Sequence, residues 1–128
     1  MTGQPLSDAE LLALADAAAE RAYAPYSRFH VGCAVLARDG RVIEGVNVEN
    51  ASYPLGVCAE EAALARAIAE GYRPGDFAVA AITASPCGGC RQWLHEMRVG
   101  RVVFRNGDRV ATMTPDDLLP ESFDPSNL

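Results

Sequence analysis

Residues 77–104, FAVAAITASPCGGCRQWLHEMRVGRVVF, contain the clearest alternation of structural patterns in the chain. Residues 77–83 form a short, almost entirely apolar run, which is typical of a buried strand. Pro86 then suits the opening of a helix over about residues 89–97, because proline is tolerated in the first turn of a helix. A second apolar, β-branched run follows at residues 101–104. The stretch therefore predicts a strand, a helix and a strand, in that order.

The residues before this stretch predict one helix and a β-hairpin. Residues 7–10, Ser-Asp-Ala-Glu, form a capping-box pattern, and apolar residues then recur at helical spacing up to a break at Pro25. Residues 31–37 and 41–47 are rich in β-branched side chains and flank an Asp-Gly pair at 39–40. Such a pair between two β-branched runs indicates two antiparallel strands joined by a tight turn.

Three further elements complete the pattern. Residues 59–70 are dominated by Ala, Glu, Leu and Arg and stop at Gly71, which is typical of a helix with a C-terminal glycine. Residues 109–113 suit a last strand, and Thr114 suits the N-cap of a final helix over residues 115–119. Helices that alternate with strands of both orientations predict the α/β class. We expect a three-layer α-β-α sandwich with one mixed sheet of about five strands.

Length and charge limit the classes of protein that the chain can belong to. Its 128 residues fit one domain over residues 1–128, because compact domains cluster at roughly 100–150 residues. Eleven arginines, no lysine and 17 acidic residues give a net charge of −6, which disfavours a nucleic-acid or anionic-membrane partner. The absence of lysine also excludes Schiff-base, pyridoxal-phosphate and Walker-type P-loop chemistry.

The sequence pattern does not favour export or membrane insertion. No apolar run approaches the ~18–20 residues of a membrane span, and residues 1–10 lack the basic and apolar regions of a signal peptide. We therefore expect a cytoplasmic protein. In that reducing compartment its four cysteines are expected to be ligands, nucleophiles or small core residues rather than disulfides. Cys33, in the middle of an expected strand, fits the core.

The other three cysteines form the pattern that carries chemistry. Cys87 and Cys90 follow Pro86 directly and open a helix, a spacing shared by redox pairs, by half of a structural zinc site and by ordinary helix starts. Cys58 also opens a helix and is followed two residues later by Glu60. Together these residues match the zinc deaminase signature, in which three protein ligands leave a fourth position for water.

Each residue type in this pattern has a chemical reason. Zinc lowers the pKa of a bound water from 15.7 to about 7, so that a nucleophile is available at neutral pH. Three thiolates around Zn²⁺ carry a net charge of −1, and two helix N-termini at about +0.5 each could offset it. Glu60 lies beside the metal without being a ligand, so it can move the protons.

The sequence resembles the small, single-domain cytidine deaminase family. The resemblance covers the chain in order from the first helix to Phe123 and implies a homotetramer with the family's fold and one zinc ion per subunit. The stretches that carry it are residues 22–32 (AYAPYSRFHVG), 45–53 (GVNVENASY), 58–60 (CAE), 85–92 (SPCGGCRQ) and 118–123 (LLPESF).

The resemblance also implies a role for individual positions. Cys58, Cys87 and Cys90 would hold zinc, with Glu60 as the catalytic acid and base. The residues implied to bind substrate are Phe29, stacked on the pyrimidine ring, Asn47 and Glu49 on the ribose hydroxyls, Ala59 beside Glu60, and Tyr53 and Phe123, which reach a neighbouring subunit's pocket.

Two features depart from the family pattern. Glu61 stands where the family usually has an arginine that neutralises the thiolates. We expect its side chain to point away from the sulfurs or to pair with an arginine such as Arg91. The connection from residue 83 to Pro86 is also several residues shorter than usual, which could reshape the rim of the pocket.

The pattern favours a zinc-dependent hydrolase of pyrimidine salvage that converts cytidine and 2′-deoxycytidine to uridine and 2′-deoxyuridine, with release of ammonia. Its expected partner is a small nucleoside. Two alternatives remain open: a deaminase of a modified cytosine nucleoside, as in blasticidin-type relatives, and a catalytically impaired protein that binds zinc or nucleoside.

Overall fold

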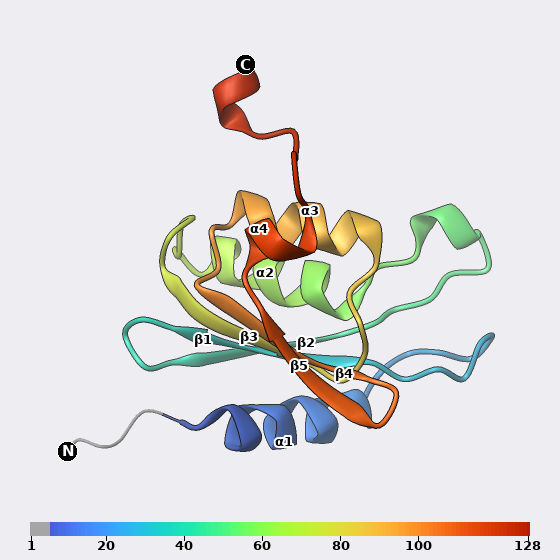
Figure 1. Ribbon diagram of the computed structural model, residues 1–128. Helices are drawn as coiled ribbons and strands as arrows, with labels where there is room; N and C mark the ends of the chain where they lie inside the picture. Colours follow the sequence, from blue (N-terminus) through green and yellow to red (C-terminus); the bar gives the residue numbers. More distant parts are fainter. Residues whose placement is uncertain (1–5) are drawn as a thin grey trace.

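The computed structural model of the protein describes residues 6–128, so residues 1–5 of the expected domain lie outside the described part. Five strands and four α-helices form the body, and two short 3-10 helices lie in loops (Figure 1). In chain order the elements are α1 (Asp8–Ala19), β1 (Gly32–Ala37), β2 (Val42–Val46), η1 (Tyr53–Leu55), α2 (Ala59–Ala69), β3 (Phe77–Ile82), α3 (Gly88–Glu96), β4 (Arg101–Asn106), β5 (Arg109–Met113), α4 (Pro115–Leu118) and η2 (Pro125–Asn127).

The strands form one mixed sheet in the order β2-β1-β3-β4-β5. Only β3 and β4 are parallel, because α3 carries the chain from the end of one strand to the start of the other. The remaining neighbours are antiparallel. The expected mixed sheet of about five strands is therefore confirmed, whereas the strand order could not be predicted from periodicity.

Helices cover both faces of the sheet, as expected for a three-layer sandwich. Figure 1 shows α1 on one face and α2, α3 and α4 on the other. All six residues of β1, which lies inside the sheet between β2 and β3, are buried, while β2 at the edge alternates between buried and half-buried positions. The larger core cluster, which includes Phe77, Leu64 and Leu94, lies on the side of α2 and α3, and a smaller one, which includes Leu11, lies under α1.

Two glycines of the sheet allow the helices to approach closely. A Cβ atom at Gly32 would lie 2.0 Å from the carbonyl oxygen of Ala15 in α1. A Cβ atom at Gly45 would lie 2.4 Å from the backbone nitrogen of Ala63 in α2. Any larger residue at either position would push a helix off the sheet, so these glycines set the spacing of the layers on both faces.

The predicted element boundaries agree with the structure to within a few residues. The Ser7 and Glu10 capping box opens α1 as predicted, but the helix ends at Ala19 rather than near Pro25. The chain turns away there because Tyr23 pairs with the segment after β2, where its N–H donates to the carbonyl of Asn47 at 3.0 Å. None of the helices within residues 6–128 is long and apolar enough to span a membrane.

Candidate active site

Three of the four cysteines meet where α2 and α3 begin. Cys58 is the N-cap of α2, Cys87 is the N-cap of α3, and Cys90 lies in the first turn of α3. In Figure 1 both helices start at the same, right-hand end of the sheet. The Sγ atoms of Cys58 and Cys87 are 3.9 Å apart, and all three sulfurs lie within 4.8 Å of one another. The predicted cluster is thus assembled in space by two helix starts far apart in sequence.

The cluster suits a soft metal cation. Thiolate ligands favour zinc among the common protein metals, and three of them leave one coordination position open. Burial raises the pKa of Cys58 to about 12 and also raises that of Cys90, so thiolates at these positions need a compensating cation. At Cys87 burial acts in the same direction, but hydrogen bonds with Cys90 and Cys58 outweigh it and lower the pKa. The donor set therefore fits zinc, which Cys58, Cys87 and Cys90 could hold together.

Glu60 lies against this cluster. Its side chain belongs to the first turn of α2, and the residue is only 3% exposed, which makes it the one buried charged residue within 6–128. Burial raises the pKa of Glu60, and the neighbouring charge of Glu61 acts in the same direction. A buried carboxyl group with a raised pKa that lines a cavity is a candidate for proton transfer. Its position and environment suit the predicted role of a general acid and base.

The sulfurs and Glu60 line a cavity of about 210 Å³. Three of the residues predicted to bind substrate also line it, namely Phe29, Asn47 and Ala59. Glu49 and Tyr53 instead line a separate cavity of about 390 Å³. Phe123 lines neither of these two cavities and is 60% exposed on the C-terminal segment. The structure thus brings together all four metal and catalytic candidates and three of the six substrate candidates.

Asn47 and Glu49 both hold the loop that carries Phe29. Asn47 accepts a hydrogen bond from the N–H of Val31 at 2.8 Å and donates one to the carbonyl of Phe29 at 2.9 Å. The Glu49 carboxylate accepts the N–H groups of Tyr26 and Ser27 and the Ser27 hydroxyl. These hydrogen bonds lower the pKa of Glu49, those from Ser27 most strongly. An amide offers two donors and a carboxylate about four acceptor sites, so both side chains keep capacity for a ligand.

Three residues of the cavity wall were not predicted from the sequence, namely Val31, Ala84 and Ser85. Ala84 and Ser85 lie in the short connection between β3 and Pro86. A hydrogen bond from the N–H of Gly32 to the Thr83 hydroxyl at 3.1 Å fixes the start of this connection. The position of Ala84 and Ser85 directly before α3 was the sequence signal that could have identified them as cavity residues. Cys33, by contrast, is fully buried in the core, as predicted.

Comparison with known proteins agrees with this geometry. Residues 6–106 match the family model described as the cytidine and deoxycytidylate deaminase zinc-binding region. A cytidine deaminase of Halalkalibacterium halodurans is 46% identical over 116 residues, covering 83% of this chain and 86% of the relative. A cytidine deaminase of Sporosarcina psychrophila is 40% identical and covers 93% of both chains. The crystal structure of cytidine deaminase from Burkholderia pseudomallei has a TM-score of 0.87 at 45% identity, covering 92% of this chain and all of that chain.

Proposed function

The chain belongs to the cytidine and deoxycytidylate deaminase family, and we propose that it hydrolyses cytidine and 2′-deoxycytidine to the uridine products with release of ammonia. One observation carries this proposal. The buried carboxyl group of Glu60 and the three cysteine sulfurs line the same cavity, which also has an aromatic wall at Phe29. Hydrolysis of an amidine carbon needs an activated water and a proton carrier, and this cavity offers a place for both.

The proposed reaction assigns the proton transfers to Glu60. Bound zinc would supply the Lewis acidity that activates a water molecule for attack on C4 of the base. Glu60 accepts one proton of that water and delivers it to the ring nitrogen. It then takes the second proton from the oxygen now bonded to C4 and passes it to the amine, whose bond to C4 breaks. One water enters, one ammonia leaves, and Glu60 ends in the state in which it began.

The remaining residues would select a neutral nucleoside. The Phe29 ring would stack on the flat base, and the backbone of Ala59 lies beside Glu60 where the base must enter. Asn47 and Glu49 would use their remaining hydrogen-bonding capacity on the ribose hydroxyls. The described lining of the 210 Å³ cavity includes no arginine or histidine that could bind a phosphate. A free nucleoside therefore fits better than a nucleotide.

We further propose that the chain forms a single domain over residues 1–128 and acts as a cytoplasmic homotetramer in pyrimidine salvage, with one zinc ion per subunit. A group of exposed apolar side chains supports the assembly, because such groups often mark protein interfaces. Tyr53 and Phe123 would each enter a neighbouring subunit's pocket. The group comprises Tyr23, Tyr26, Phe29, Val48, Tyr53, Leu55 and Val57, and Phe123 is exposed separately on the C-terminal segment.

A modified cytosine nucleoside is the second candidate substrate. The observation that favours it is the short connection after β3, which leaves only the small side chains of Ala84 and Ser85 at the cavity wall. Small residues at that point would leave room for a bulkier base.

The test combines zinc content with turnover of the purified protein. We expect about one zinc ion per chain, loss of the ultraviolet absorbance of cytidine and release of one ammonia per uridine formed. Turnover of a base-modified cytidine but not of cytidine would favour the second candidate. Zinc without turnover of any cytosine nucleoside would contradict the proposal, and light scattering at the mass of one subunit would contradict the tetramer.

A further inference from the structure

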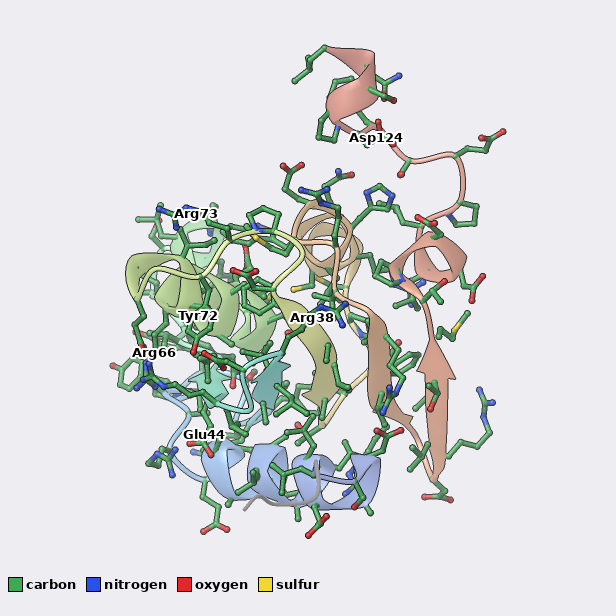
Figure 2. The ribbon with its side chains drawn as sticks, turned by 90° about the vertical axis from the view of Figure 1, so that its left-hand side faces the viewer. Arg38, Glu44, Arg66, Tyr72, Arg73 and Asp124 are labelled. Carbon is green, nitrogen blue, oxygen red and sulfur yellow. The ribbon has the colours of Figure 1, made fainter. Side chains whose placement is uncertain are left out.

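The C-terminal segment, residues 119–128, leaves the body of the molecule. Leu118 is the last buried residue, and every residue after it is half-buried or exposed. Figure 1 shows this segment rising away from α4, and Figure 2 shows Asp124 on the side of α3 that faces away from the sheet, where it lines a surface pocket with His95 and Glu96. Hydrophobic burial therefore contributes little to its conformation, although Phe123 lies within it.

Two side chains of α3 hold this segment through polar contacts. The Gln92 amide nitrogen Nε2 donates a hydrogen bond to the backbone carbonyl of Phe123 at 2.8 Å. The Ser122 hydroxyl lies 2.9 Å from Nε2 of His95. Residues three apart share one face of a helix, so Gln92 and His95 present neighbouring contacts to consecutive residues of the segment. Together they fix the backbone on both sides of the peptide bond between Ser122 and Phe123.

The surroundings of His95 orient its ring. Nε2 also lies 3.0 Å from the Asp116 carboxylate of α4, and an ionised carboxylate can only accept. Nε2 therefore carries a hydrogen, and on a neutral ring Nδ1 is an acceptor. Nδ1 is buried and has no hydrogen-bond partner within the described residues. The ring is thus set between α4 and the C-terminal segment and is not free to rotate into solvent.

The backbone before Phe123 also needs to be held. Glu121 has φ of 53°, in the left-handed region that costs energy for residues other than glycine. A turn of this kind persists only when neighbouring contacts enforce it. The contacts made by Ser122 and Phe123 follow this turn directly.

We propose that Gln92 and His95 are positioning residues that set the direction of the Phe123 side chain for its place in a neighbouring subunit's pocket. The inference rests on the proposed role of Phe123. Neither residue touches substrate in this scheme. Each residue acts by ordering an otherwise weakly held segment before assembly. The Phe123 ring then loses less conformational entropy when it enters the neighbouring subunit's pocket.

A double-mutant cycle on kcat/KM tests this inference. Gln92→Met keeps the length of the side chain, adds no charge and removes the donor to the Phe123 carbonyl. We expect Gln92→Met to raise KM more than it lowers kcat, with a total loss in kcat/KM of up to about 100-fold. In a Phe123→Ala background the same substitution should cause no further loss, because no ring remains to be positioned.

Additional variants keep the test decisive. Ser122→Ala removes only the hydroxyl contact to His95. It should also lower kcat/KM in the wild-type background but not in the Phe123→Ala background, and it replaces Gln92→Met in the test if that variant fails to fold or loses zinc. Glu20→Ala is the control, because Glu20 is exposed at the end of α1, on the opposite face of the sheet, and its side chain makes none of the described hydrogen bonds. It should leave kcat/KM unchanged.

The outcomes separate this inference from the proposed function. Equal losses from Gln92→Met with and without the Phe123 ring would overturn the positioning role. A Phe123→Ala variant with the wild-type kcat/KM would contradict both the positioning role of Gln92 and His95 and the proposed binding of Phe123 in a neighbouring pocket. It would not contradict the proposed deaminase activity. Absence of turnover in the wild-type chain would instead contradict the proposed function.

Discussion

The Glu61 carboxylate accepts a hydrogen bond from the backbone N–H of Cys58 at 2.9 Å. Glu61 thereby acts as the N3 residue at the start of α2 and satisfies a donor that the helix itself cannot pair. Of the two alternatives expected for Glu61, the pairing with Arg91 is wrong. Arg91 donates instead to the carbonyls of Pro86 at 2.9 Å and Leu118 at 3.1 Å, which ties α3 to α4.

This contact predicts two opposite effects of Glu61→Gln. Loss of the charge at the helix start should lower the free energy of unfolding of the metal-free protein by roughly 0.3–1 kcal/mol. Zinc binding displaces thiol protons and leaves the site with a net charge of −1, so loss of the negative charge at the Cys58 backbone should strengthen zinc binding, as measured by competition with a coloured chelator. Glu10→Gln is the matched control, because Glu10 occupies the same N3 position in α1, far from the sulfurs. It should lower stability to a similar extent and leave zinc affinity unchanged, and an equal effect of both variants on zinc would contradict the argument.

Replacement of Glu60 should separate catalysis from metal binding. Glu60→Gln removes the proton carrier but no sulfur, so turnover of cytidine should fall by about 10²- to 10⁴-fold while zinc content stays near one per chain. Metal analysis and ammonia release on the same sample measure both quantities. Substantial activity in this variant would remove Glu60 from the proton pathway.

The cysteines should divide into one structural residue and three ligands. Cys90→Ala should reduce the zinc content and the activity, whereas Cys33→Ala should lower stability by about 1 kcal/mol or more through a small core cavity and retain zinc. Cys33 is the matched control because both residues are almost completely buried. A chelator that removes zinc should likewise lower the Tm of the wild type and of Cys33→Ala but not that of Cys90→Ala. Full zinc content in Cys90→Ala would contradict the assignment.

The close approach of α2 to the sheet predicts a large effect of one added methyl group. In Gly45→Ala the new Cβ atom would lie 2.4 Å from backbone nitrogen and 2.5 Å from a backbone carbonyl oxygen, so α2 must shift. We expect a loss of about 1–3 kcal/mol in the free energy of unfolding, measured by denaturant titration. Gly89→Ala provides the control, because its Cβ atom would meet no atom within 4 Å. Equal stabilities of the two variants would show that the layers can separate freely.

Asp39 predicts part of the acid sensitivity of the fold. Its carboxylate accepts hydrogen bonds from the N–H of Arg41 at 3.1 Å and from the Tyr72 hydroxyl at 2.8 Å, which hold the pKa of Asp39 below its usual 3.8. Figure 2 shows Tyr72 between α2 and the sheet. A lowered folded-state pKa contributes stability above pH 3.8 that is lost as the pH falls through the folded value. Asp39→Asn should therefore be less stable than the wild type at neutral pH, and the difference should shrink in acid. A difference that is constant with pH would contradict this origin.

The chemistry of the site could be predicted from the sequence because its signals are local. Cys58 and the Cys87–Cys90 pair each begin a helix, and the position of Glu60 relative to Cys58 is fixed by two residues of chain. Helix starts, the Asp-Gly turn and the strand periodicity likewise depend on neighbours within a few residues. The α/β class, the mixed sheet and the candidate zinc ligands followed from these patterns.

Contacts between distant residues could not be predicted in this way. The sequence alone did not predict that Asn47 and Glu49 hold the Phe29 loop. It also did not predict that Glu61 accepts a hydrogen bond from the Cys58 backbone rather than pairing with Arg91. The hydrogen bond from Gln92 to the carbonyl of Phe123 was not predicted either. The strand order β2-β1-β3-β4-β5 could not be predicted from the sequence either. Sequence periodicity specifies which face of an element is buried, whereas the partner of that face is selected by packing and hydrogen bonding across the whole folded chain.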